Sequence, residues 1–186
     1  MRIQAGEMAP DVQAVDVFGR AVSLRSLRGR PVLLSFYRYA SCPVCNLRVR
    51  DLRQAAPALE ALGLALVGVF QSDAATIGRY VGRQQAPFPL VADPGLALYR
   101  RYGVERGWAA MLRWPTMAAA LRAFAAGYLP GRIDGPFDRT PADFLIGADG
   151  RVLSAHYGRH LSDHVSVEAL QAALGVPGGG QAQAAR

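Results

Sequence analysis

Short apolar runs alternate with amphipathic segments through the middle of the chain. Three of the runs have the length and composition of strands buried on both faces of a sheet: residues 31–38, 64–70 and 88–92. The segments that follow them repeat apolar residues at the spacing of a helix: residues 43–62, 73–83 and 95–102. Because strands that alternate with helices need parallel crossovers, we predict an α/β domain with a parallel sheet at its centre.

The two ends of the chain depart from this alternation. Residues 14–17 and 21–24 flank a Phe-Gly turn and predict a small hairpin, as an N-terminal extension. Residues 143–147 and 152–157 flank Asp149-Gly150, a pair that suits a tight antiparallel hairpin, so the central sheet should be mixed. A last helix is expected over residues 167–174. Residues 175–186 have glycine, proline and no periodicity, which predicts a flexible tail after a single domain of residues 1–174.

Composition excludes some partners. The formal net charge of +7 comes from arginine alone, and the chain has no lysine. The arginines are dispersed and form no strip interleaved with aromatic residues, so we expect no nucleic-acid partner. No signal peptide is visible at the N-terminus, which predicts a cytoplasmic protein, and no apolar stretch of about 18 residues occurs, so we expect no membrane partner.

The only two cysteines, Cys42 and Cys45, stand where a predicted strand passes into a helix. Cys42 takes the N-cap position and Pro43 the first helical position, where a missing N–H costs nothing. Unpaired N–H groups and the positive helix end stabilise a thiolate at Cys42, which makes it the nucleophile and Cys45 the resolving thiol. Arg38 and Arg48 are candidates for further stabilisation of the thiolate. Two inert buried cysteines are the structural alternative, and redox chemistry requires that Cys42 be reachable.

Three motifs carry a family resemblance: GEMAPDV at residue 6, VSLRSLRGRPVLLSFYRYASCPVCN at residue 22 and TPADFLIGADGRVLSAHYG at residue 140. Over residues 6–172 the chain resembles the thioredoxin superfamily, in its peroxiredoxin-like branch called the AhpC/TSA or redoxin family. The resemblance implies a thioredoxin-like fold, an oxidoreductase that acts on disulfides or peroxides, and no cofactor. It also implies a cis proline at Pro141, with the backbone of Thr140 pairing with substrate, and places Tyr39 and Pro43 beside the substrate.

The sequence departs from the family at positions that bear on activity. Members that reduce peroxide carry a proline and a threonine or serine where this chain has Ser35 and Tyr39, and their site arginine falls where Pro141 stands. Thioredoxins carry a buried carboxylate in the strand before the cysteines, where this chain has Ser35 and Phe36, so the usual proton acceptor for Cys45 is missing. The departures from the peroxide-reducing members favour thiol-disulfide exchange, whereas the missing carboxylate leaves the redox potential and the direction of the reaction open.

Three functions stay open. The first is a thiol-disulfide oxidoreductase in which Cys42 attacks a disulfide and Cys45 resolves the mixed disulfide. The second is a thiol-dependent peroxidase that draws electrons from thioredoxin or glutathione. The third is a redox sensor or binding module that uses the disulfide only as a switch.

Two further features have no assigned chemistry. Residues 105–139 are too long for a simple connection and carry Met117, Leu121, Phe124 and Tyr128 at helical spacing, which predicts a helical insertion. The insertion either caps the active site, forms a homodimer face or packs on the domain's own core. His156, His160 and His164 recur every four residues, but the first lies in a predicted strand. We therefore expect surface histidines and no metal site.

Overall fold

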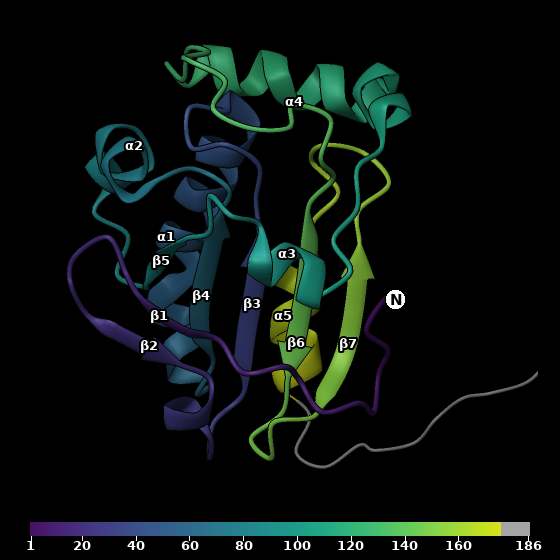
Figure 1. The fold of residues 1–186 in the computed structure, drawn as a ribbon. Helices are drawn as coiled ribbons and strands as arrows, with labels where there is room; N and C mark the ends of the chain where they lie inside the picture. The colour runs from purple at the N-terminus through teal and green to yellow at the C-terminus, as the bar shows by residue number, and fades with distance from the viewer. Residues whose placement is uncertain (176–186) are drawn as a thin grey trace, which may run out of the picture.

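A computed structural model describes residues 1–175 and shows a five-stranded mixed sheet, in the order β5-β4-β3-β6-β7 (Figure 1). The strands are β3 (Val32–Phe36), β4 (Ala65–Phe70), β5 (Leu90–Ala92), β6 (Ala142–Ile146) and β7 (Val152–Tyr157). β3 pairs in parallel with β4 and antiparallel with β6, and β7 is antiparallel to β6. A separate hairpin of β1 (Gln13–Val15) and β2 (Ala21–Ser23) forms the N-terminal extension. The predicted mixed α/β sheet is confirmed.

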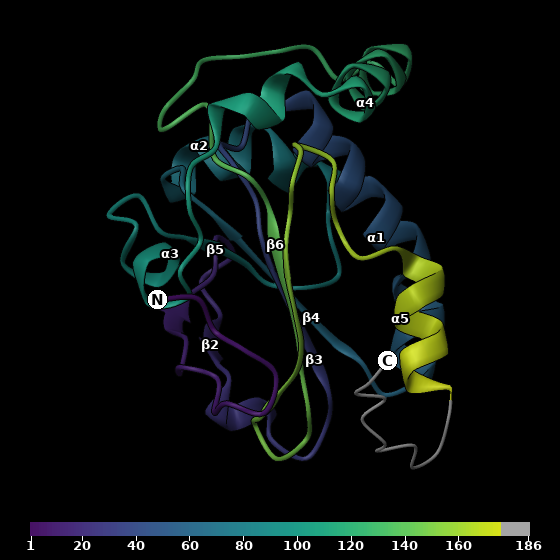
Figure 2. The same ribbon diagram turned by 90° about the vertical axis from the view of Figure 1, so that its right-hand side faces the viewer.

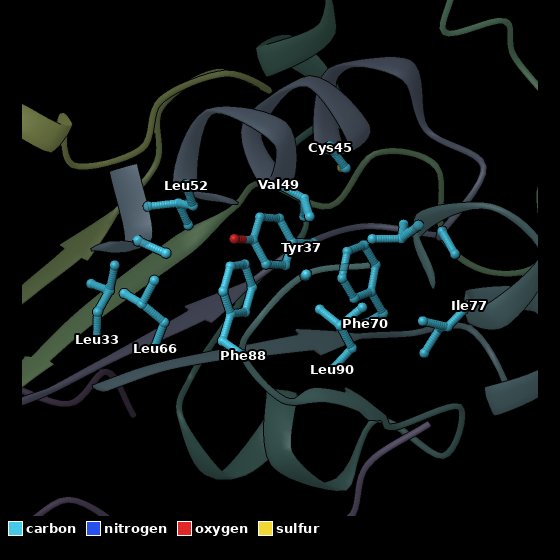
Figure 3. Packing of buried hydrophobic residues seen from close by; sticks show 14 of the residues in the cluster. Leu33, Tyr37, Cys45, Val49, Leu52, Leu66, Phe70, Ile77, Phe88 and Leu90 are labelled. Carbon is cyan, nitrogen blue, oxygen red and sulfur yellow. The ribbon is translucent and has the colours of Figure 1, made fainter. Parts of the chain in front are cut away.

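Helices cover both faces of the sheet (Figure 2). The helices are α1 (Pro43–Ala61), α2 (Ala74–Arg79), α3 (Ala97–Arg101), α4 (Trp114–Ala125) and α5 (Val167–Leu174). On one face the core joins α1, α2 and α5 to the sheet, with Tyr37 at its centre between Val49, Phe70 and Cys45 (Figure 3). On the other face α3 and the N-terminal hairpin pack through a cluster that includes Tyr99 and Tyr102. The cysteine helix therefore lies on one fully covered side of the sheet.

The described chain also contains short 3-10 helices, at Arg25–Leu27, Val81–Gln84 and Trp108–Leu112. The helix expected over residues 73–83 is broken at Tyr80 into α2 and the second of these 3-10 helices. Gly78 and Gly82 lie in this stretch, and glycine costs about 1 kcal/mol relative to alanine inside a helix. Asp73 caps α2 by accepting a hydrogen bond from the Thr76 amide at 2.7 Å.

The insertion of residues 105–139 contains α4, which lies across one end of the domain (Figure 1). Its inward face carries small side chains, Thr116, Ala119 and Ala123. The apolar stripe points outward instead, with Met117, Leu121 and Phe124 exposed. Packing of the whole stripe on the domain's own core, one of the three expectations, is wrong because alanines already fill the contact with α1. Only Tyr128, the last residue of the stripe, is half-buried, and its hydroxyl donates to the Gln84 side-chain oxygen at 3.4 Å. No helix among residues 1–175 is long and apolar enough to cross a membrane.

Of the predicted tail, only Gly175 belongs to the described residues, and residues 176–186 lie outside them.

Candidate active site

Cys42 caps the cysteine helix, as the sequence predicts. Its sulfur accepts a hydrogen bond from the Cys45 amide at 3.4 Å, and Pro43 occupies the first helical turn. The loop before the helix is held by Asn46, whose amide donates to the carbonyl oxygens of Ala40 at 2.7 Å and Cys42 at 2.9 Å. Both cysteines carry free thiols. The strand-to-helix junction therefore places Cys42 at the positive end of α1, with Cys45 one turn further on.

The two thiols differ in pKa. Burial acts to raise the pKa of Cys42, but a hydrogen bond from the Cys45 thiol, the charge of Arg38 and the amides of Cys45 and Val44 outweigh it and lower the pKa to about 6. The pKa of Cys45 is raised well above its usual value by burial and by the hydrogen bond and charge of Cys42. At neutral pH this arrangement has a thiolate at Cys42 and a thiol at Cys45, which suits a nucleophile and a resolving group.

Arg38 is buried beside the sulfurs, with only 5% of its surface exposed. Burial lowers its pKa, but the charges of Cys42 and Cys45 more than offset this, and the pKa of Arg38 is raised. One guanidinium nitrogen donates to the Tyr39 hydroxyl at 2.9 Å, and the guanidinium lies 4.8 Å from the centre of the Tyr39 ring. Its Nε and Nη1 have no hydrogen-bond partner among residues 1–175. Arg38 thus keeps two donors for an anion, and Tyr39 orients it.

Arg48, the second candidate for stabilising the thiolate, is hydrogen-bonded to the backbone before α5. Its Nη2 donates to the Val165 carbonyl oxygen at 2.6 Å, which ties the cysteine helix to the segment before α5. Its charge acts on Asp143 and on Tyr37. The contact with Val165 gives Arg48 a structural use that its position in the sequence did not reveal.

Access to Cys42 differs from the expectation. Cys42 is 1% exposed and Cys45 3% exposed, so neither sulfur is reachable from solvent in this conformation. After α4 the chain runs back over this end of the domain before it enters β6 (Figure 2), and we call residues 132–136 of this run the strap. The expectation of a reachable thiolate is therefore wrong for this conformation, because the insertion lies against the cysteine loop.

Three hydrogen bonds hold the strap. Ser41 donates to the Arg132 carbonyl oxygen at 2.6 Å, Ser72 to the Asp134 carboxylate at 2.8 Å and Gln71 to the Pro136 carbonyl oxygen at 2.9 Å. The approach is close at Gly135, where a Cβ would lie 2.7 Å from the Gln71 amide nitrogen. The strap can move away from the cysteine loop only if these hydrogen bonds break.

Pro141 opens β6 with a trans peptide bond, since no cis bond occurs among the described residues. The expectation of a cis proline is wrong. The carbonyl oxygen of Pro141 accepts a hydrogen bond from the Gly158 amide at 2.8 Å, which continues the antiparallel pairing of β6 with β7. The trans form is the favoured isomer before proline, and an extended strand start accommodates it. Thr140 is half-buried, and its pairing with a substrate stays a prediction.

A buried acid–base pair, Asp143 and His164, lies under the cysteine helix. Asp143 faces Ser35 across the β3–β6 pairing, and its carboxylate lies 3.0 Å from Nδ1 of His164 and accepts the Val165 amide at 2.8 Å. The His164 side chain is 4% exposed, and its ring lies 5.3 Å from that of Tyr37. The expected surface position of His164 is wrong, since β6 and the loop before α5 enclose it.

Sequence reasoning missed this pair, because it searched β3 alone for a carboxylate. The neighbouring strand supplies one. A signal was available, because Asp143 is a charged residue in an otherwise apolar strand, Ala142–Ile146.

The chain is similar in sequence to proteins of a known family. A family model described as the AhpC/TSA family matches residues 5–154. The chain belongs to the AhpC/TSA family. Within this family, it is 30% identical over 103 residues to "Peroxiredoxin Q, chloroplastic" of Oryza sativa subsp. japonica, a match that covers 55% of this chain and 48% of that protein. The chain thus spans about half the length of this curated relative.

The chain is also similar in sequence to a protein named for disulfide chemistry, and in fold to a solved structure. "Thiol-disulfide oxidoreductase ResA" of Halalkalibacterium halodurans is 29% identical over 103 residues, which cover 55% of this chain and 58% of that protein. The crystal structure of Peroxidoxin BcpB from Mycobacterium tuberculosis superposes with a TM-score of 0.65 at 18% identity, and covers 93% of this chain and 94% of that one. The fold of this AhpC/TSA chain is therefore thioredoxin-like.

The other two histidines make local contacts. Nε2 of His156 lies 3.0 Å from the Asp163 carboxylate, and Nδ1 of His160 lies 3.2 Å from the Ser162 hydroxyl. Among residues 1–175 no group of three or more His, Cys, Asp or Glu side chains is placed to hold a metal ion.

Proposed function

We propose that this chain is a thiol-disulfide oxidoreductase that works through the Cys42 and Cys45 dithiol. The observation that supports the proposal is that the pKa values of the two thiols shift in opposite directions. The pKa of Cys42 is lowered to about 6, and the pKa of Cys45 is raised. A single hydrogen-bonded pair in this state holds an ionised nucleophile next to a protonated resolving thiol.

The reaction proceeds in two exchanges. The Cys42 thiolate attacks one sulfur of a substrate disulfide, forms a mixed disulfide and releases the other sulfur as a thiolate. Cys45 then loses its proton and attacks the Cys42 sulfur, which expels the second substrate thiolate and leaves a Cys42–Cys45 disulfide. The substrate gains two electrons and the protein loses two. Thioredoxin or glutathione is the proposed reductant that returns the dithiol, in the cytoplasm.

Peroxide reduction is the second candidate, and Arg38 favours it. Two buried guanidinium nitrogens of Arg38, beside the Cys42 thiolate, have no hydrogen-bond partner in the part of the chain that the structure describes. Such donors can hold a peroxide oxygen while the thiolate attacks it, which would give a sulfenic acid at Cys42 and release water or an alcohol. Condensation with Cys45 would then form the same disulfide with loss of water. Ser35 and Tyr39 still differ from the residues of peroxide-reducing members.

The test compares the wild type with Cys42→Ser and Cys45→Ser in two assays, reduction of insulin disulfides and consumption of hydrogen peroxide. For disulfide exchange we expect turnover of insulin by the wild type, and in Cys45→Ser a trapped mixed disulfide at Cys42. A sulfenic acid at Cys42 in Cys45→Ser, formed with stoichiometric peroxide and without insulin turnover by the wild type, would favour the peroxidase. If all three proteins behave alike in both assays, neither chemistry belongs to these cysteines.

A further inference from the structure

An apolar surface on the insertion is left uncovered by the rest of residues 1–175. We call it the insertion face, and its exposed side chains are Trp108, Leu112, Trp114, Met117, Leu121 and Phe124. They are between 44 and 74% exposed. In α4 the members recur three or four residues apart, so they share the side of the helix opposite to Ala119 and Ala123, which are buried. Single exposed apolar residues are common on protein surfaces, whereas large groups of neighbouring exposed apolar residues are typical of interaction sites.

Within the segment that forms the insertion face, the formal charges have one sign. Residues 107–133 contain three arginines, Arg113, Arg122 and Arg132, and no aspartate or glutamate. All three arginines are exposed, and none of them forms an ion pair among residues 1–175. Acidic residues return towards the two ends of the insertion, where Glu105 pairs with Arg2 at 2.9 Å, Asp138 pairs with Arg106 at 2.7 Å, and Asp134 accepts a hydrogen bond from Ser72 at 2.8 Å. The insertion therefore combines exposed apolar side chains with three exposed arginines that form no ion pair within residues 1–175.

The exposed apolar side chains and the arginines together favour an anionic bilayer over a second copy of the chain as the binding partner. A second copy of the chain would bring the same arginines together around the symmetry axis without a carboxylate to neutralise them. An anionic bilayer supplies phosphate groups for the arginines and an apolar interior for the leucine and phenylalanine side chains. Tryptophan is the residue that favours the level of the lipid headgroups, because its ring is apolar and its N–H is polar.

We propose that the insertion face binds the surface of an anionic lipid bilayer, with α4 lying in the membrane plane. This kind of binding needs an amphipathic helix and basic residues and does not need a membrane-spanning segment. The absence of an apolar stretch, from which we expected no membrane partner, therefore does not oppose it. α4 packs on α1, so the face belongs to the same end of the domain as the cysteine loop (Figure 1).

Tryptophan fluorescence can be used to test the proposal. Its only two tryptophans, Trp108 and Trp114, both lie in the insertion face. Addition of vesicles made of phosphatidylglycerol and phosphatidylcholine should shift the tryptophan emission to shorter wavelength and sediment the reduced protein with the lipid. Vesicles of phosphatidylcholine alone, or high salt, should weaken the binding severalfold, because each arginine near an anionic surface contributes a few-fold in affinity.

Two substitutions with matched controls locate the contact. Leu121→Ser should weaken partitioning into anionic vesicles about tenfold, the value expected when one leucine no longer enters an apolar phase. Leu153→Ser, which alters a 56% exposed leucine on β7, should not. Arg122→Glu should weaken it at least about fivefold, whereas Arg25→Glu, at a distant exposed arginine, should have a small effect. Circular dichroism shows whether each variant is folded.

Absence of an emission shift and of sedimentation with anionic vesicles would overturn the proposal, as would equal losses in the face variants and their controls. Concentration-dependent dimers that are abolished by Leu121→Ser, without vesicle binding, would assign the face to a second copy instead. The measurement does not use the thiol chemistry, and insulin reduction without lipid should be the same in Leu121→Ser and the wild type. Failure here is therefore distinguishable from failure of the proposed redox function.

Discussion

Asp143 and His164 lie 3.0 Å apart in the core, and the cysteine helix is joined to them through one backbone segment. Asp143 accepts the amide of Val165, and the carbonyl oxygen of the same residue accepts Arg48 of α1. Burial acts to raise the pKa of Asp143, but the charge and hydrogen bond of His164 and the charge of Arg48 outweigh it, and the pKa is lowered. The buried carboxylate is thus ionised, and its bond to the Val165 amide joins it to the cysteine helix through Arg48.

Asp143→Asn should lower the free energy of unfolding by about 2 kcal/mol at neutral pH, because hydrogen bonds to a buried charged group are lost. A carboxyl with a lowered folded pKa stabilises the protein above its unfolded pKa of about 3.9, and this stabilisation is lost as pH falls toward the folded pKa. The difference between variant and wild type should therefore shrink below about pH 4. Urea unfolding at neutral and acid pH measures it, with the exposed Asp149→Asn as control. An equal difference at both pH values would contradict the assignment.

Arg38→Gln should raise the pKa of Cys42 above its value of about 6, by about one unit, since a nearby positive charge favours the thiolate. The measurement is the ultraviolet absorbance of the thiolate in the reduced protein as a function of pH. Arg48→Gln is the matched control and should leave the midpoint in place, because Arg48 is bonded to Val165. A midpoint that moves as far in Arg48→Gln as in Arg38→Gln would show that the charge of Arg38 is not the specific cause.

Ser41→Ala should make Cys42 more accessible. The variant loses the hydrogen bond that holds the strap at Arg132, and one such bond stabilises by about 1 kcal/mol. If reagents reach Cys42 only when the strap opens, alkylation by iodoacetamide at fixed pH should accelerate about fivefold. Ser26→Ala removes a hydrogen bond of similar length, 2.8 Å, far from the site and should not change the rate. Equal rates in wild type and Ser41→Ala would show that this bond does not limit access.

Pro57→Ala should stabilise the protein. Pro57 lies inside α1 and is exposed, and it lacks the N–H that would bond to the preceding turn. Proline in a helix interior is about 3 kcal/mol less favourable than alanine, so a gain of about 1–3 kcal/mol is expected from thermal or urea unfolding. Pro115→Ala, at the start of α4, is the control, since proline costs little there. A variant no more stable than the wild type would mean that packing around Pro57 compensates for the missing bond.

The order of strands and helices and the place of Cys42 at the start of a helix could be predicted from the sequence. Buried strands, the cysteine helix and its N-cap at Cys42 follow from apolar periodicity and from the residues at a helix start, which are local properties of the chain. For the same reason the terminal hairpin of β6 and β7 was predicted from a short run that contains Asp-Gly.

The surroundings of the cysteines could not be predicted in this way, because they depend on contacts between distant segments of the chain. Asp143 reaches the core opposite Ser35 because β6 pairs with β3, and these residues lie more than a hundred positions apart in the chain. The strap is bonded to Ser41, the residue before Cys42. Met117, Leu121 and Phe124 of α4 face outward because alanines rather than larger residues pack on α1. Such contacts depend on which segments meet after folding, and periodicity along a single segment shows which side of a helix is apolar but not what lies against it.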